Sequence, residues 1–349
     1  MLTPTAFPFT TGNASTTERW RRFLIRQGHH IQILAIENLN PLELKQRLSH
    51  FKPEIIHLHH AYRTGESFLK SNTEWSDHGR GLVVSPGGTD IYLDNEMGDR
   101  RKIIAQVFEK AKAIIVQSDE MFQRIAESYH GIQGKVILIP KSVCWMGEEE
   151  FDLRRASDCG PEEILFFFPA GIRPVKGNLE ALTLLDRIHR LRPMARAVFA
   201  GPAIDKPYSE RFGREIERHR SFARWLPAIP FEAMRSAYKG ADVVLNFSFS
   251  EGVSNVLLEA KAAGKPILAS DIPGNRWLVL GDGDDLPAGL LFDPHSPEDF
   301  IQQALRLIDE SDLREKLGQG GKDPSAKFPT PEEEARSLAQ VYRKILEEG

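Results

Sequence analysis

The sequence has little cysteine and no long apolar run, and each absence excludes a class of protein. Its two cysteines, Cys144 and Cys159, provide neither a disulfide framework nor the ligand pattern of a zinc site. No stretch approaches the roughly 20 apolar residues that span a bilayer, and the first residues lack the basic and apolar regions of a signal peptide. A reduced, cytoplasmic setting is therefore expected.

The sequence also lacks an excess of positive charge. Its net charge of −4 argues against general binding to nucleic acid or to an anionic membrane surface. The exception is Arg19–Arg26 (RWRRFLIR), which as a helix would present a cationic face, so at most peripheral membrane association is expected. Hydrophobic residues make up 41% of the chain and charged residues 27%, which is ordinary for a globular protein.

Apolar runs of strand length alternate with helical patterns along the whole chain. In the first half, strands are predicted at 31–36, 55–58, 82–84, 113–117 and 136–139, and helices at 15–27, 41–49, 98–112 and 120–128. In the second half, strands are predicted at 164–168, 196–200, 222–226, 241–247 and 266–270, and helices at 178–191, 208–219, 231–238, 297–310 and 311–317. This alternation predicts an α/β fold with doubly wound parallel sheets.

The length suits two domains, and composition suggests their boundaries. Residues 146–162 carry an acidic run with little periodicity, so we predict a linker between Rossmann-like domains at 1–145 and 163–325. The last helix, at 331–349, is long enough to cross back over the first domain. Pro4 follows the opening residues at once, so the first strand is expected to be short or to begin upstream. Ligands of open α/β sheets bind at the carboxyl ends of the strands, which predicts a ligand cleft between the domains.

The stretch 248–264 (SFSEGVSNVLLEAKAAG) joins a buried strand to a helix through a turn of small and polar residues. A helix start after such a turn presents free backbone N–H groups and the positive end of the helix dipole, both of which suit a phosphate. Glu251 lies in the turn and Glu259 two turns along the helix, where their carboxylates would accept hydrogen bonds from hydroxyl groups. The alternative interpretation is a surface helix with two solvated acids.

The spacing of Glu251 and Glu259 resembles the E-x7-E signature of family-4 (group 1) GT-B glycosyltransferases, and the context SEGVSNVLLEAKAAGKPILASDIPGN followed by GLLFDP strengthens that resemblance. The likeness is strong over 164–295 and looser over 12–140. Four segments, TGNASTTERW, HHAYRTG, GGTDIY and GIRPVKG, are similar to the small group typified by the glycosyltransferase 1 domain-containing protein 1 and to bacterial selenosugar synthases.

The resemblance implies a GT-B fold and a retaining, metal-independent transfer from a nucleotide-sugar, usually UDP-linked, with no cofactor besides that donor. Glu259 would hold the ribose hydroxyls, and Glu251 would act as a catalytic residue that holds the transferred sugar. The acceptor would attack the face that the diphosphate leaves. The turn and helix start would bind the donor through Gly252, Val253, Ser254, Asn255 and Val256.

The loop 170–177 (AGIRPVKG) carries Arg173 and Lys176 between a strand and a helix. Arginine binds phosphate oxygens in a bidentate manner and lysine supplies a point charge, so both are predicted to neutralise the leaving diphosphate. In the similar family the arginine usually lies at the position of Gly171, and Arg173 is displaced from it by two residues. A solvated basic turn is the alternative interpretation.

A loop of the first half, Gly87-Gly88-Thr89-Asp90, resembles the H-G-[ST]-D loop of the same family. The family histidine, which approaches the donor sugar, is Gly87 here. We therefore expect Asp90, as a catalytic residue, or His60 to contact the acceptor or the transferred sugar, with Gly87 and Gly88 lining the site.

Gly12 and Asn13, in a stretch predicted to be a loop, are expected to lie close to the donor phosphates because glycine allows close backbone approach. The histidines of 57–60 raise a metal hypothesis, but no second cluster of ligands supports it, and no metal is predicted. The DGDD sequence at 282–285 is interpreted as a turn.

Three other functions stay open. A nucleotide-sugar 2-epimerase shares the GT-B fold but needs acid and base groups that the sequence does not offer. A non-catalytic nucleotide-sugar-binding protein is compatible with Gly87, and a transferase could form a selenosugar or thiosugar. The sequence leaves open the donor sugar, its base, the acceptor and the oligomeric state.

Overall fold

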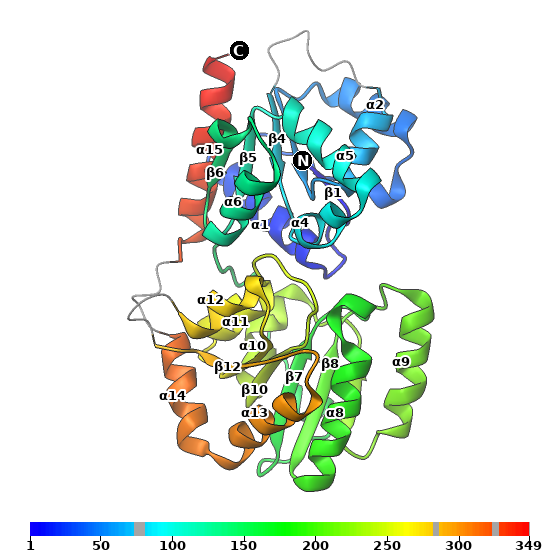
Figure 1. Cartoon of the computed structure of the whole chain (residues 1–349), viewed down its shortest axis with the longest axis vertical. Helices are drawn as coiled ribbons and strands as arrows, with labels where there is room; N and C mark the ends of the chain where they lie inside the picture. The colour runs from blue at the N-terminus through cyan, green and yellow to red at the C-terminus, as the bar shows by residue number, and fades with distance from the viewer. Residues whose placement is uncertain (73–80, 282–285, 323–327, 349) are drawn as a thin grey trace. The chain divides into compact units, whose positions relative to one another are not determined.

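The structure is a computed structural model that describes residues 1–72, 81–281, 286–322 and 328–348. It divides into two compact units (Figure 1). Unit 1 comprises Met1–Ser142 and Phe328–Gly349, and unit 2 comprises Val143–Lys327. Each unit is built on a six-stranded sheet of its own. The DGDD turn predicted at 282–285 lies outside the described residues.

Unit 1 has a parallel sheet with the strand order β2-β1-β3-β4-β5-β6. Its strands are β1 (Leu2–Thr3), β2 (Leu34–Ala35), β3 (Ile55–His59), β4 (Gly81–Ser85), β5 (Ala113–Val116) and β6 (Val136–Leu138). Its helices are α1 (Gly12–Arg26), α2 (Pro41–Phe51), α3 (Arg63–Lys70), α4 (Thr89–Tyr92), α5 (Gly98–Lys110), α6 (Asp119–Ser128) and α15 (Pro331–Glu347).

Helix α15, at the end of the chain, belongs to unit 1 as predicted and packs on α1 and β4 (Figure 1). Thr330 and Glu333 form a capping box at its start, which satisfies backbone N–H groups that the first turn leaves free. Glu334 is buried and accepts hydrogen bonds from Arg19 Nε at 2.9 Å and Trp20 Nε1 at 2.7 Å. The backbone N–H of Ser142 donates to the same carboxylate at 3.1 Å. One acid therefore joins α15, α1 and the segment that leaves unit 1.

Unit 2 has a parallel sheet with the strand order β12-β11-β10-β7-β8-β9. Its strands are β7 (Ile164–Pro169), β8 (Ala195–Ala200), β9 (Ala223–Leu226), β10 (Val243–Asn246), β11 (Ile267–Ser270) and β12 (Gly289–Phe292). Its helices are α7 (Leu153–Ala156), α8 (Asn178–Leu191), α9 (Lys206–Arg218), α10 (Met234–Gly240), α11 (Asn255–Ala262), α12 (Pro273–Leu280), α13 (Pro297–Asp309) and α14 (Ser311–Gly321).

The order of unit 2 reverses between β7 and β10. From β7 the chain builds outward through β8 and β9, and from β10 it builds the other way through β11 and β12. Ligands of open α/β sheets bind outside the carboxyl ends of the strands at such a switch point. The loops that follow β7 and β10 are therefore the ones that the topology selects for a site.

The predicted α/β fold with two doubly wound parallel sheets is confirmed, and the bounds of some local elements differ from the prediction. Helix α1 starts at Gly12 because the Thr11 side chain caps it, accepting from Ala14 N at 3.3 Å. Strand β2 is only two residues long. Helix α12, which begins with Pro273, was not predicted. Part of the predicted linker forms α7, whose Leu153 is fully buried, and the residues predicted as linker belong to unit 2.

Candidate functional site

An ion pair joins the two switch-point loops of unit 2. Lys176 Nζ donates to Glu251 Oε1, and only 13% and 14% of the two side chains is exposed. Lys176 comes from the loop after β7 and Glu251 from the loop after β10, so the structure brings together two predicted catalytic residues. Burial alone would raise the pKa of Glu251, but the charge and hydrogen bond of Lys176 hold it below its ordinary value. The carboxylate is therefore ionised.

Two polar side chains orient the Glu251 carboxylate from its own loop. Ser248 Oγ donates to Glu251 Oε1 at 2.8 Å. The Asn246 amide donates to Ser254 Oγ at 3.1 Å and to Glu251 Oε1 at 3.4 Å, while its oxygen accepts from Ser248 N at 3.0 Å. Asn246 thus ties both ends of the loop to the last residue of β10. The prediction omitted it, although an amide that ends an apolar strand run is a signal for such a role.

The loop after β7 reaches Glu251 because Gly177 allows close packing. Gly177 has φ +61°, and a Cβ added there would lie 2.5 Å from the Phe247 carbonyl oxygen. A backbone hydrogen bond from Phe249 N to Val175 O, 2.9 Å long, ties the same two loops together. A side chain at position 177 would separate the loops, so glycine is required for the ion pair to form.

Asn178 begins α8 and is a candidate that the sequence prediction missed. Its Oδ1 accepts from Arg173 N at 3.1 Å, which holds the backbone of the basic loop. The residue is fully buried, and its Nδ2 finds no hydrogen-bond acceptor within the described ranges. Helix α8 has no side-chain cap at its start, so its first N–H groups and dipole add to an environment that suits an anion.

Helix α11 starts at Asn255 with Ser254 at its N-cap. Glu259 lies on this helix and accepts a hydrogen bond from the Tyr238 hydroxyl at 2.8 Å. The loop between Glu251 and α11 is backed by α12, since a Cβ added at Gly274 would lie 2.2 Å from the Gly252 oxygen. The predicted residues Gly252, Val253, Ser254, Asn255 and Val256 all lie in this loop or in the first turn of α11.

In unit 1, backbone N–H groups of neighbouring residues surround the Asp90 carboxylate. Its carboxylate accepts from Ala61 N at 2.6 Å and from Gly87 N and Gly88 N, each at 2.9 Å. The side chain has no exposed surface. These contacts identify Asp90 as the residue that shapes the glycine loop, and its predicted catalytic role stays a prediction.

His60, Gly87 and Asn13 meet at the start of α1. A Cβ added at Gly87 would lie 3.4 Å from His60 Cδ2 and 3.5 Å from Asn13 Oδ1. His60 has φ 82°, and its Nε2 hydrogen-bonds to Thr89 Oγ1 at 3.1 Å. Gly12 and Asn13 form the first turn of α1 rather than a loop, so their N–H groups lie at a helix N-terminus. The structure therefore brings together the predicted residues of unit 1.

His57, which belongs to the metal hypothesis, is a core residue. Its ring nitrogens bond to Tyr342 and Ser85, each at 2.6 Å. Burial lowers the pKa of His57 to about 3, so the ring is neutral. Within the described ranges no three His, Cys, Asp or Glu side chains are arranged to hold a metal ion. Likewise, none of the helices described there combines the length and hydropathy that crossing a membrane requires.

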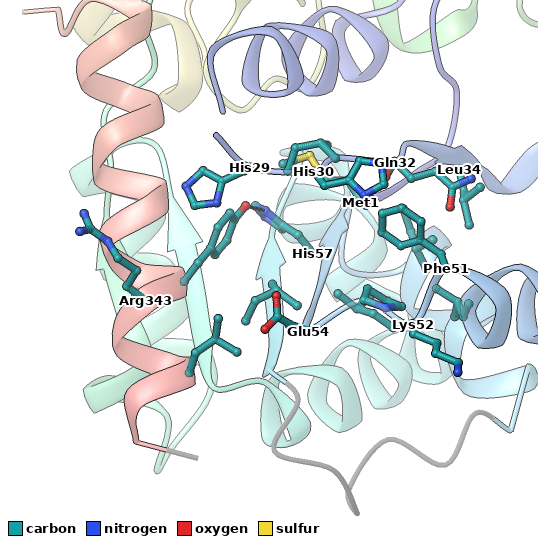
Figure 2. A pocket seen from close by; sticks show the side chains of 18 residues that line it. Met1, His29, His30, Gln32, Leu34, Phe51, Lys52, Glu54, His57 and Arg343 are labelled. Carbon is teal, nitrogen blue, oxygen red and sulfur yellow. Dashed lines mark hydrogen bonds between the residues drawn. The ribbon is translucent and has the colours of Figure 1, made fainter. Parts of the chain in front are cut away.

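A cavity of about 230 Å³ lies at the amino ends of β1 and β3 in the unit 1 sheet (Figure 2). Met1, Gln32, Lys52, Glu54 and Arg343 line it. None of the predicted site residues contributes to it. Parallel strands place their ligand loops at the carboxyl ends, so this cavity is separate from the predicted site.

Comparisons with known proteins show which family the sequence resembles. Residues 150–323 match the family model described as glycosyl transferases group 1. The chain is 23% identical over 318 residues to glycosyltransferase 1 domain-containing protein 1 from Xenopus tropicalis, covering 89% of this chain and 88% of the relative. It is 26% identical to D-inositol 3-phosphate glycosyltransferase from Corynebacterium jeikeium, covering 73% and 62% of the two chains.

Solved structures share the fold. Anabaena Alr3699/HepE in complex with UDP and glucose superposes with a TM-score of 0.72 at 14% identity, covering 93% of this chain and 88% of that one. Sucrose-phosphate synthase from Thermosynechococcus elongatus gives a TM-score of 0.71 at 16% identity, covering 88% and 78%. The two six-stranded parallel sheets are thus those of the GT-B fold.

Proposed function

We propose that this chain, which belongs to the group 1 glycosyltransferases through residues 150–323, is a retaining, metal-independent enzyme that transfers a sugar from a UDP-linked donor. Neighbours of the same fold were crystallised with UDP and with UDP-glucose, which supports that choice of nucleotide. The cysteine-poor chain suits a cytoplasmic enzyme.

The observation that carries the proposal is the buried pair of Lys176 and Glu251 at the switch point of unit 2. A donor diphosphate would replace Glu251 as the partner of Lys176, because it is the stronger anion. Glu251 would then accept hydrogen bonds from the hydroxyls of the transferred sugar. In the free protein the two side chains therefore bind each other, and on donor binding each would bind a group of the donor instead.

The leaving diphosphate gains charge as the sugar departs, so fixed donors around it lower the barrier. Lys176, Arg173 and the N-terminus of α8 would supply those donors, together with Asn178 Nδ2, which has no acceptor among the described residues. Ser254 and Asn255 at the start of α11 would add backbone N–H groups. Glu259, on the same helix, would accept hydrogen bonds from the ribose hydroxyls.

Retention follows in this proposal from attack on the face that the diphosphate leaves, with a phosphate oxygen taking the acceptor proton. The ionised state of Glu251 suits it to accept hydrogen bonds and to stabilise positive charge on the sugar ring, and does not suit it to donate a proton. In unit 1, Gly12, Asn13, His60 and Gly87 would contact the acceptor, with Asp90 holding the loop that presents Gly87.

Calorimetric titration with UDP, ADP and GDP tests the donor site. We expect wild type to bind one of them, and Glu259→Ala to weaken that binding by about 10- to 100-fold, the effect of losing hydrogen bonds to a charged group. Glu315→Ala, which removes an exposed glutamate from helix α14, should leave binding unchanged. If wild type binds no nucleoside diphosphate, the donor-site assignment is wrong.

A further inference from the structure

Tyr238 is a fully buried residue of α10 whose hydroxyl reaches the helix that carries the second signature glutamate. The hydroxyl donates to Glu259 Oε2 at 2.8 Å, and the carbonyl oxygen of Val256 lies farther away, at 3.5 Å. A buried tyrosine hydroxyl needs a hydrogen-bond partner, and a backbone oxygen would satisfy that need. Here the shorter bond goes to the Glu259 carboxylate, which the proposed function assigns to binding the ligand.

Two rings hold the tyrosine in place. The Phe167 ring of β7 packs edge to face at 5.3 Å between centroids, with an interplanar angle of 74°. The Trp145 ring packs on it at 5.7 Å and 60°. Contacts of this kind restrict the ring to one rotamer, because a rotation would clash with both neighbours. The hydroxyl is therefore a fixed point of the unit 2 core.

The donor role of this hydroxyl does not change with pH. Burial raises the pKa of Tyr238 well above its ordinary value, and the nearby Glu259 charge raises it further. The phenol therefore keeps its proton across the working range of an enzyme. A carboxylate oxygen has more than one acceptor site, so Glu259 Oε2 retains capacity for a ligand hydroxyl beside the bond from Tyr238.

We propose that Tyr238 is a positioning residue of the donor site, which holds the Glu259 carboxylate in the orientation that accepts the two ribose hydroxyls of a nucleoside diphosphate. The inference rests on the proposed function. A glutamate side chain has several rotatable bonds, and recognition of a vicinal diol needs both carboxylate oxygens in one plane with it. The bond from Tyr238 fixes that plane before the ligand arrives, which is preorganisation. Tyr238 thereby sets the preference for a ribonucleotide over a 2′-deoxyribonucleotide.

The experiment compares the dissociation constants of UDP and 2′-deoxy-UDP by calorimetry for wild type, Tyr238→Phe, Glu259→Gln and Tyr342→Phe, with the ADP and GDP pairs in parallel. The Tyr342 hydroxyl is also buried and bonds to His57 in unit 1, so its loss is a matched control. We expect wild type to prefer the ribonucleotide by about tenfold, the effect of one hydrogen bond to a charged group. Tyr238→Phe should weaken UDP binding by about tenfold and reduce the preference to less than about threefold.

Glu259→Gln should show the same reduced preference, and Tyr342→Phe should keep that of wild type. A purely structural role for Tyr238 would lower the melting temperature and leave the ratio of the two dissociation constants as in wild type, which overturns the inference. The inference also fails, with the proposed function intact, if wild type binds UDP without a ribose preference. If wild type binds no nucleoside diphosphate at all, the proposed function fails and this assignment fails with it.

Discussion

Two carboxylates of unit 1 and two of unit 2 are held by different kinds of partner. In unit 1, Asp90 accepts from three backbone N–H groups, and Glu334 is bound by Arg19, Trp20 and Ser142. In unit 2, Glu251 is held by Lys176 and Ser248, and Glu259 accepts a bond from Tyr238.

Asp90 and Glu251 show this difference most clearly. Backbone N–H groups cannot move away from Asp90 without unfolding the loop that they belong to. The Lys176 side chain can exchange its partner, since it moves by rotation about its own bonds. Burial alone therefore does not distinguish a carboxylate held by backbone, such as Asp90, from one held by a movable side chain, such as Glu251.

The largest effect is expected in unit 1. Glu334→Gln leaves the Arg19 guanidinium, 3% exposed, without its counter-charge, and breaking a buried ion pair costs about 3–5 kcal/mol. Denaturant unfolding measures this loss. Glu332→Gln, on the same helix but with a half-exposed carboxylate, should cost about 0–1 kcal/mol. Equal effects of the two variants would contradict the structural role of Glu334.

The same pair makes a pH prediction. Burial would raise the pKa of Glu334, but Arg19 holds it below its ordinary value, so the folded pKa is lower than the unfolded one. The ionised carboxylate therefore stabilises the protein above roughly pH 4.3, and this contribution is lost as the pH falls through the folded pKa. The gap in unfolding free energy between wild type and Glu334→Gln should narrow on acidification. A gap that stays constant from pH 7 to pH 3 would show that the carboxylate is not charged in the fold.

In unit 2, Lys176→Met should remove catalysis while the fold persists. Loss of one fixed donor to developing charge lowers kcat by about 10²–10³-fold. The measurement is the release of nucleoside diphosphate from the donor that calorimetry identifies. Lys239→Met, which removes an exposed lysine of α10, is the control and should retain wild-type turnover. Wild-type turnover in Lys176→Met would remove Lys176 from the proposed mechanism.

Asp90→Ala tests the other side of the comparison. It leaves three N–H groups without their acceptor, two of them in buried hydrogen bonds, and we expect a loss of about 3 kcal/mol in unfolding free energy. Asp99→Ala, with an almost fully exposed carboxylate in the same unit, should change stability by less than about 0.5 kcal/mol. An Asp90→Ala protein of wild-type stability that has lost turnover would instead support a direct catalytic role.

The smallest effect is expected from Gly274→Ala. The new Cβ would lie 2.2 Å from the backbone carbonyl oxygen of Gly252 and 2.4 Å from that of Glu251. The loop must therefore shift, and nucleotide affinity should fall by about tenfold. Gly213→Ala in α9 meets its nearest neighbour at an ordinary 3.6 Å and should be neutral or stabilising. Unchanged affinity in Gly274→Ala would mean that the position of this loop does not control donor binding.

Much of the fold was predictable because its signals are local. The helix at 178–191 has the predicted bounds in the structure, since both its periodicity and its glycine start lie within one stretch. The start of α1 was not predicted, because it depends on the Thr11 side chain folding back onto Ala14 N. Helix α7 was missed as well, since four residues are too few to show a period.

The candidate site divides in the same way. Lys176 and Glu251 were predicted from their loops, but they lie 75 positions apart, and their pairing depends on the close packing of Gly177 on Phe247. Tyr238 and Glu259 are 21 positions apart, and nothing in the residues around Tyr238 indicates its partner. Asn178 is one residue beyond the predicted basic loop, and only its burial identifies its amide as a candidate.

By itself, the sequence determined the α/β alternation, the strand-turn-helix stretch of 248–264 and the identity of the acidic and basic side chains near it, because these follow from spacing and residue type within short segments. Only the tertiary structure decided that backbone N–H groups enclose Asp90 and that a lysine side chain pairs with Glu251. That distinction arises from strand order, which brings the loops after β7 and β10 together at the switch point, and from glycine contacts between segments far apart in the chain. Neither the strand order nor these contacts can be predicted from the local sequence.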